Sequence, residues 1–585
     1  MAPMVQPRWL PLVAVLLVLP SPAVAQVGGA ARDRQQPSVV RRGTASIVGR
    51  VVAADSGRPL RLARVSATAP ELSDGRVSMT DENGMFEFPE LPAGRYSVSA
   101  SKTGYITVNF GQRRPLRAGR PIEVRDGQRV RDIDFRLPRG SVITGRVLDQ
   151  DGEPLVRASI RALRYRFVQG ERRIEPGGGA ETDDRGQFRI YGLPPGTYFV
   201  SATAQPADAG AAARMAAMSA AGNPAANLAP DSPHTPGSLT YAPTYYPGVA
   251  ALSDAAAVTA PIGEEVAGID FSLQLVTAAR VTGIVAGASG VAPNTTVLLV
   301  PDDSRGMSGQ SYSGRVGRDG TFSISNVPPG RYIAIARGQP RRGEQDAFAV
   351  QPLSVSGPLV SDVTLVLAGA TTISGQVTFD GAATPTAQDY TRLRIGLWAP
   401  AAESLPMFGG PMNTTPRPDG SFTIPNVPAG SRLFRVAGLQ SPWALKGVYL
   451  DGRDVTDEMF AVKPGETVGR VSIVVSDKAT TLTGAVRDEQ EQPLSDFTVI
   501  AFPSDSNLWR PQSRFIQAVR PDKDGLYTVR GLPPGEYLLR AVDDVDQGEW
   551  YDPELLQSLR TGATRVMLQE GDNKSVDLKL MVSSQ

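Results

Sequence analysis

The sequence predicts an all-β protein that consists of five tandem β-sandwich domains after a signal peptide. Three observations support this fold class: a pair of glycines ten residues apart occurs five times, the second glycine always follows a proline-containing turn, and the flanking segments alternate apolar and polar residues. Alternation with a period of two is typical of strands buried on one face, and self-similarity at a fixed spacing indicates repeated domains. The glycine pairs are Gly84 and Gly94, Gly186 and Gly196, Gly320 and Gly330, Gly420 and Gly430, and Gly525 and Gly535.

The N-terminal segment carries targeting signals. Arg8 precedes the apolar run from Trp9 to Leu19, and Ala23-Val24-Ala25 offers the small residues of a cleavage site, so residues 1–25 are predicted to be a cleaved signal peptide. Residues 26–43 are predicted to be a flexible polar tether. The apolar run is shorter than the roughly 20 residues of a membrane anchor. We therefore expect an extracytoplasmic protein that is secreted, periplasmic or on the cell surface, with no transmembrane segment in the mature chain.

Five predicted units follow the tether. Only three or four residues separate the closing strand of one unit from the first strand of the next. Unit 2 is longer than the others because of an Ala- and Pro-rich insertion at 204–240, which is expected to be mobile. The short joints argue against free tumbling and suggest an end-to-end, stalk-like string. The predicted ranges, which we call units 1 to 5, are 44–138, 139–277, 278–368, 369–476 and 477–585.

The most regular local feature is the L/V-P-x-G segment around the second glycine of each pair, which we call the landmark turn. Proline presets φ and glycine accepts positive φ, so this turn is encoded locally. In unit 2, Phe188 and Ile190 precede the turn, and Tyr198 and Val200 follow it with the same alternation. We therefore predict that each landmark turn closes a β-hairpin.

Residue counts argue against catalysis. The chain has no cysteine and one histidine, His234, which lies in the insertion of unit 2. Ser/His/Asp and Cys/His sites need an oriented base, and catalytic zinc usually needs several nitrogen or sulfur ligands. A carboxylate pair for glycosidic chemistry would need a shared cleft, which five small sandwiches do not obviously offer. We expect no enzyme activity, no catalytic residues, no metal and no cofactor. With 60 basic and 59 acidic residues, we also expect no nucleic-acid partner.

An acidic turn precedes the first glycine of each pair, as in Asp81-Glu82-Asn83-Gly84. Calcium loops need several oxygen ligands that converge on one point, and only three of the five turns hold two acidic residues. The alternative is a β-turn in which Asp accepts hydrogen bonds from its own backbone and Gly takes positive φ. We favour the β-turn.

Aromatic residues on late loops are the best candidates for ligand contact. Flat aromatic faces suit sugar rings, and Tyr and Trp add a polar tip. The alternative, which we favour, is that the rings cover the open end of a sandwich core. The candidates are Tyr241, Tyr245 and Tyr246 in unit 2 and Trp550 and Tyr551 in unit 5.

The whole set of landmarks resembles the carboxypeptidase regulatory-like domain, a transthyretin-like (prealbumin-like) or Ig-like β-sandwich that is similar to carbohydrate-binding-like folds. Units 3 and 4 depart from the pattern, and Arg432 replaces the expected tyrosine. In metallocarboxypeptidases this domain is the non-catalytic companion of a zinc peptidase, so the resemblance implies a fold and no peptidase activity. Unit 1 carries the pattern as Gly49, Val51, Asp55, Gly57, Pro59, Leu60, Ala63, Val65, Thr80, Asp81, Gly84, Phe86, Leu91, Pro92, Gly94, Tyr96, Val98 and Ala100.

These inferences predict a non-catalytic extracytoplasmic interaction, adhesion or spacer protein. Its expected partner is a polysaccharide or a cell-surface or extracellular protein. Two alternatives stay open: a carbohydrate-binding protein that uses the loop aromatics, and a regulatory companion of a separate hydrolase.

Overall fold

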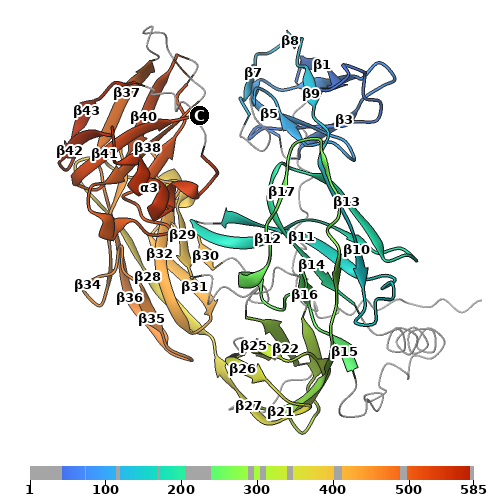
Figure 1. Cartoon of the computed structure of the whole chain (residues 1–585). Coiled ribbons are helices and arrows are strands. Elements are labelled where there is room, and N and C mark those ends of the chain that lie inside the picture. The colour runs from blue at the N-terminus through green and yellow to red at the C-terminus, as the bar shows by residue number, and fades with distance from the viewer. Residues whose placement is uncertain are drawn as a thin grey trace, which may run out of the picture.

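The structure is a computed structural model in which nearly all regular elements are strands, so the predicted all-β fold class is confirmed (Figure 1). It describes residues 43–579 except 73, 113–118, 169, 205–238, 288–294, 303–310, 339–346, 401–411, 488–493, 495–496, 523 and 544. The predicted signal peptide, almost all of the tether, most of the insertion and His234 lie outside the described residues and stay predictions. Within the described segments, no helix combines the length and the apolar character needed to cross a membrane.

Unit 1 shows the common plan of two facing sheets. Its strands are β1 (Ala45–Ala53), β2 (Arg64–Thr68), β3 (Arg76–Met79), β4 (Met85–Leu91), β5 (Gly94–Ser101), β6 (Val108–Asn109), β7 (Ile122–Val124), β8 (Arg129–Val130) and β9 (Phe135–Leu137). One sheet has the order β4-β1-β8 with β9 also on β1, and the other has the order β3-β2-β5-β6 with β7 also on β5. The first strand runs antiparallel to β4 and parallel to the closing strands β8 and β9.

Unit 2 repeats this plan with longer strands. One sheet has the order β13-β10-β18, the other has the order β12-β11-β14-β16, and β15 pairs separately with β20. Its elements are β10 (Ser141–Leu148), β11 (Ser159–Val168), β12 (Glu171–Glu181), β13 (Gln187–Leu193), β14 (Gly196–Thr203), β15 (Leu239–Tyr241), β16 (Thr244–Tyr245), the 3-10 helix η2 (Leu252–Asp254), β17 (Val258–Ala260), β18 (Glu265–Val266), β19 (Phe271–Ser272) and β20 (Leu275–Thr277).

Unit 3 differs in one respect, because pairing of β26 with β27 joins its two sheets into one of seven strands, β23-β22-β25-β26-β27-β21-β24. Its strands are β21 (Ala279–Gly287), β22 (Thr296–Pro301), β23 (Tyr312–Arg315), β24 (Thr321–Val327), β25 (Gly330–Gly338), β26 (Ala347–Val355) and β27 (Leu359–Gly369).

Units 4 and 5 return to two sheets each. Unit 4 contains β28 (Thr371–Asp380), α2 (Ala387–Arg392), β29 (Arg394–Trp398), β30 (Asn413–Thr414), β31 (Ser421–Val427), β32 (Gly430–Ala437), β33 (Ala444–Leu450), β34 (Arg453–Asp454), β35 (Phe460–Val462) and β36 (Thr467–Ser476). Unit 5 contains β37 (Thr481–Arg487), β38 (Thr498–Pro503), the 3-10 helices η4 (Ser506–Leu508) and η5 (Glu549–Tyr551), β39 (Gln517–Val519), β40 (Leu526–Arg530), β41 (Gly535–Val542), α3 (Pro553–Leu559), β42 (Thr564–Leu568), β43 (Asn573–Ser575) and β44 (Leu578–Lys579).

A glycine in the first strand of each unit lets the closing segment approach. A Cβ atom on any of these glycines would lie between 1.9 and 2.2 Å from a carbonyl oxygen of that segment, so no side chain fits without displacing backbone. The five glycines are Gly49, Gly145, Gly283, Gly375 and Gly484.

The predicted hairpin at each landmark turn is wrong. In unit 1, β4 and β5 lie in different sheets, so the turn carries the chain across the core. Phe86 and Phe88 before the turn are buried, as are Tyr96 and Val98 after it, and the two pairs face each other from opposite sheets. A hairpin within one sheet would show the same period-two pattern, so alternation alone does not distinguish the two arrangements.

The described residues contain five large clusters of buried apolar side chains, and each cluster draws its members from a single predicted unit. Burial of apolar side chains, the main contribution to folding, therefore takes place mostly within units. The boundaries between units stay a prediction.

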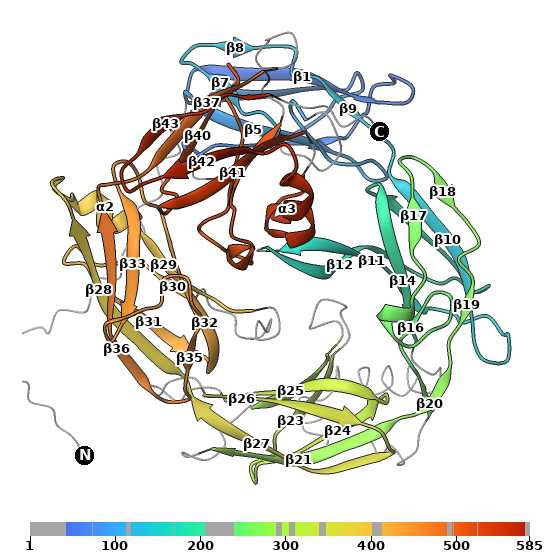
Figure 2. The same ribbon diagram turned by 60° about the vertical axis from the view of Figure 1, so that its left-hand side comes forward.

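Units 2 to 5 are arranged in a ring, and unit 1 extends from unit 2 outside it (Figure 1 and Figure 2). The tip of the β11–β12 hairpin of unit 2 contacts unit 5, where a Cβ on Gly170 would lie 2.8 Å from the ring of Tyr551, and a Cβ on Gly548 would lie 3.3 Å from Cβ of Phe167. The expected end-to-end string is thus wrong for this structure. Short joints restrict tumbling, but they leave the angle between neighbouring units to be set by side-chain contacts.

Candidate functional site

A buried side chain two residues after the second glycine locks each landmark turn. In units 1, 2, 3 and 5 it is a tyrosine whose hydroxyl donates to the carbonyl oxygen of the turn proline, at 2.6 to 2.8 Å. In unit 4, Arg432 occupies this place and donates to the carbonyl oxygens of Pro428 at 2.9 Å, Ala429 at 3.0 Å and Ser431 at 2.7 Å. The landmark that defines the repeat therefore serves the fold.

The acidic turns also serve the fold, because their Asp side chains accept hydrogen bonds within the turn. Oδ1 of Asp81 accepts hydrogen bonds from the backbone N–H groups of Asn83 and Met85, with N–O distances of 2.8 Å in both cases. In unit 3, the hydroxyl and N–H of Thr321 donate to Asp319 and hold the pKa of that carboxyl below its usual value. The first glycines take φ between 71° and 83°. These contacts agree with the β-turn interpretation, and the described part of the chain holds no group of three or more His, Cys, Asp or Glu residues suited to a metal.

Two of the candidate aromatics pack against the core of unit 2. Tyr241 and Tyr246 are partly buried against this core, and the ring of Tyr246 meets that of Phe271 edge to face, with centroids 6.0 Å apart. Burial raises the pKa of Tyr241 above its usual value. Most of the surface of these rings is therefore already committed to packing.

Trp550 and Tyr551 lie in η5 of unit 5, where Tyr551 contacts unit 2. Both pack against a second apolar cluster of unit 5 that includes Trp509 and Leu556, and Tyr551 lies against Gly170 of unit 2. Burial raises the pKa of the Tyr551 hydroxyl. Their position links two units of the ring.

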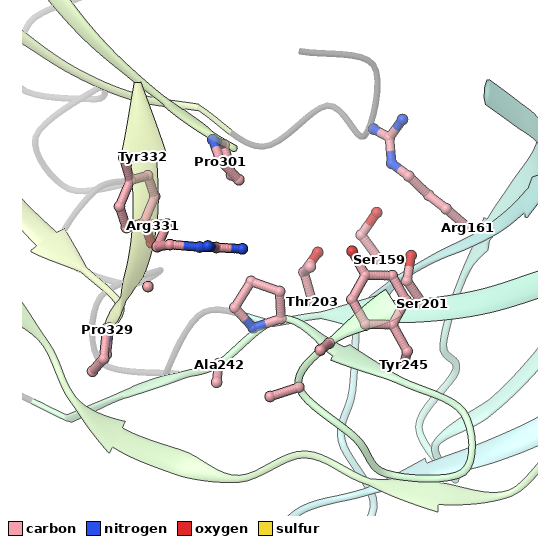
Figure 3. A pocket seen from close by; sticks show the side chains of 14 residues that line it. Ser159, Arg161, Ser201, Thr203, Ala242, Tyr245, Pro301, Pro329, Arg331 and Tyr332 are labelled. Atoms are coloured by element: carbon pink, nitrogen blue, oxygen red, sulfur yellow. The ribbon is translucent and has the colours of Figure 1, made fainter. Parts of the chain in front are cut away.

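Tyr245 is the candidate aromatic that lines a pocket. It is 5% exposed and packs with Leu163 and Ile174 on the outer face of a unit 2 sheet. Beside it, between unit 2 and unit 3, lies a cavity of about 300 Å³ (Figure 3). That volume is at the lower end of the range of small-molecule sites.

The unit 2 wall of this cavity is a sheet surface made of small hydroxylated side chains. Ile160 on β11 and Ala202 on β14 face the core, so their neighbours along each strand face outward. Across the two strands, Ser159 pairs with Thr203 and Arg161 with Ser201, and all four line the cavity. Small side chains on this face leave the space that the cavity occupies.

The unit 3 wall is the landmark turn of that unit, with Pro301 from the end of β22. Pro329, Gly330, Arg331 and Tyr332 all line the cavity. The hydroxyl of Tyr332 donates its hydrogen bond to the carbonyl oxygen of Pro328. The Arg331 side chain, in contrast, extends from the turn toward Thr203 on the opposite wall (Figure 3).

The charged side chains known to line the cavity are all positive. Arg161 and Arg331 face it from opposite walls, and the residues known to line it include no carboxylate. Within the described parts of the chain, neither guanidinium has an ion-pair partner, and the hydroxyls of Ser159, Ser201 and Thr203 make no hydrogen bond. The arrangement offers positive charge and hydrogen-bonding groups to a small anionic ligand.

Tyr245 could be recognised from the sequence as a candidate, whereas Arg161, Arg331 and the three hydroxyls could not. The cavity depends on how unit 3 packs on unit 2, which no local pattern encodes. A weak signal was present: Ser and Thr occupy the outward positions of two neighbouring strands. Arginine beside a landmark turn is not informative alone, since Arg95 holds the same place in unit 1.

The fold and its turns define a class of small β-sandwich domains, and one known family matches two parts of the chain. The model of the carboxypeptidase regulatory-like domain matches residues 46–138 and 142–218, which confirms the resemblance for unit 1 and for much of unit 2. No curated protein matches the chain.

Solved structures that are similar to the chain include two bacterial pilins and one further bacterial protein. The Bacillus anthracis TIE protein is 10% identical, with 75% of this chain and 74% of that chain covered and a TM-score of 0.14. The minor pilin GBS52 of Streptococcus agalactiae is 14% identical over 40% of this chain and 96% of its own, with a TM-score of 0.20. BcpA, the major pilin subunit of Bacillus cereus, is 10% identical over 55% and 99%, with a TM-score of 0.15.

Proposed function

We propose that the mature chain is a non-catalytic extracytoplasmic interaction protein, whose β-sandwich units act together to present a binding site between them. The observation that carries this proposal is the cavity between units 2 and 3, which neither unit forms alone. The described residues that line it offer binding groups but no nucleophile paired with a base and no pair of carboxylates. Nucleophilic catalysis and glycoside hydrolysis rely on such pairs.

Contacts between another pair of neighbouring units, units 4 and 5, support a fixed arrangement of this kind. Nε of Arg514 in unit 5 lies 2.9 Å from a carboxylate oxygen of Asp457 in unit 4, and both side chains are largely buried. Arg435 of unit 4 donates to the backbone of Gln512 in unit 5, and burial lowers the pKa of Arg435 to about 10. Contacts that hold neighbouring units in place would keep a shared site preorganised.

Cell fractionation followed by a binding assay tests the proposal. In the producing cells, we expect the chain outside the cytoplasm with Gln26 as its N-terminal residue, measured by mass spectrometry of the intact protein. The purified chain of residues 26–585 should be retained by immobilised extracellular polymer from the same cells. A chain found in the cytoplasm with residues 1–25 intact, or one that is not retained, would contradict the proposal.

A further inference from the structure

We propose that the cavity between units 2 and 3 binds a uronic acid residue, the carboxylated sugar unit of acidic polysaccharides. This inference rests on the proposed function and names the ligand chemistry of the same site. Each part of such a ligand has a counterpart in the lining, and the counterparts come from both walls (Figure 3).

The carboxylate is assigned to the two arginines. Arg331 reaches into the cavity from unit 3, and Arg161 faces it from the unit 2 sheet. A guanidinium binds a carboxylate through two parallel hydrogen bonds, and no carboxylate among the described lining residues competes for them. A neutral ligand would leave two positive charges facing the same partly enclosed space.

The sugar hydroxyls are assigned to the unit 2 wall. Ser159, Ser201 and Thr203 are directed outward from adjacent strands. Each hydroxyl can donate one hydrogen bond and accept two, which matches the mixed donor and acceptor character of a sugar ring. Inorganic phosphate or sulfate would use the arginines but would leave much of this wall without a partner.

The apolar face of the sugar is assigned to the rings around the cavity. Pro301 and Pro329 lie on the unit 3 side, and Tyr245 lies on the unit 2 side. Flat rings suit the C–H face of a pyranose. The cavity volume of about 300 Å³ limits the site to roughly one sugar unit.

Isothermal titration calorimetry on the chain of residues 26–585 tests this assignment. The probes are galacturonic acid, trigalacturonate, galactose and sodium sulfate. We expect the two uronates to bind at least about tenfold more tightly than galactose, because a charge-assisted hydrogen bond is lost with the carboxylate. Affinity should fall as salt rises, since the interaction is between charges. Tighter binding of the trimer than of the monosaccharide would identify polymer as the source.

Arg331→Gln and Arg161→Gln should each weaken uronate binding by about tenfold or more. The matched control is Arg95→Gln, which removes an arginine from the equivalent place in the landmark turn of unit 1 and should change affinity less than twofold. Thr203→Leu, which fills the cavity without altering charge, should also weaken binding. Circular dichroism of each variant checks that the fold is retained.

Three results would overturn the assignment: galactose binding as tightly as galacturonic acid, sulfate binding as tightly as the uronates, or Arg331→Gln leaving the affinity unchanged. Retention on the extracellular polymer with no uronate binding would remove the ligand assignment and leave the proposed function in place. If the wild-type chain were not retained on the extracellular polymer, both the ligand assignment and the proposed function would be wrong.

Discussion

The landmark turns of units 3 and 4 close in the same way with different chemistry. In unit 3, Tyr332 gives one hydrogen bond to the turn and meets Tyr312 edge to face, with ring centroids 5.9 Å apart. In unit 4, Arg432 is 2% exposed and gives hydrogen bonds to three carbonyl oxygens of the turn. The turn therefore requires a hydrogen-bond donor at this place, and a buried cation can serve when enough carbonyl oxygens accept its hydrogen bonds.

The largest effect is expected from removing the donor in unit 4. Arg432→Ala should lower the free energy of unfolding of that unit by about 3–5 kcal/mol, because buried carbonyls lose their partner and a cavity remains. Hydrogen exchange of peptides from units 3 and 4 measures the loss. Arg432→Tyr should restore part of it. If Arg432→Ala exchanges no faster than wild type, the closing role of this arginine is wrong.

The next largest effect is expected at alkaline pH, which should destabilise unit 3 through Tyr312. Burial raises the pKa of Tyr312 from 10.0 to about 12, so the folded state favours the neutral phenol. The neutral phenol therefore contributes up to about 3 kcal/mol to the free energy of unfolding. This contribution is fully present below pH 10 and is lost as the pH rises through 12. Thermal melts of wild type and Tyr312→Phe should therefore converge or cross between pH 10 and 12. Parallel melting curves across this window would contradict the prediction.

Removing one hydroxyl from the turn of unit 3 should have a smaller effect. Tyr332→Phe keeps the ring in place and deletes the bond to Pro328, so we expect a loss of about 1 kcal/mol. Denaturant titration read by hydrogen exchange of unit 3 peptides checks this value. A loss as large as that of Arg432→Ala would show that the two turns do not differ as argued.

The smallest effect on stability is expected next to Tyr332. Arg331 is exposed on the same turn and makes no hydrogen bond or ion pair within the described residues through its side chain, so Arg331→Ala should change the free energy of unfolding by less than about 0.5 kcal/mol. Equilibrium denaturation tests this. A large loss would assign Arg331 to the fold and would weaken the argument that it is free to bind a ligand.

Much of the fold could be predicted from the sequence because its signals are local. Positive φ at the paired glycines and period-two burial arise within a few residues, as in β1, whose residues alternate between buried and more exposed. The pairing of β4 with β1 instead of β5 could not be predicted, because alternation records which face is buried and not which strand lies alongside.

The candidate site was less predictable. Tyr245 could be named as an aromatic on a late loop, yet its surroundings come from unit 3, more than fifty residues further along the chain. Arg161 and Arg331 are two among many arginines, and only the packing of two units brings them to one cavity. Sites between domains depend on angles that no short motif contains.

The contact of Gly170 with Tyr551 sets how far apart units 2 and 5 lie. Units 2 and 5 are far apart in the chain, and closing this contact shortens the span between them to that of touching neighbours. If the hairpin tip parted from η5, the ring would open there while each sandwich, stabilised by its own core, stayed folded.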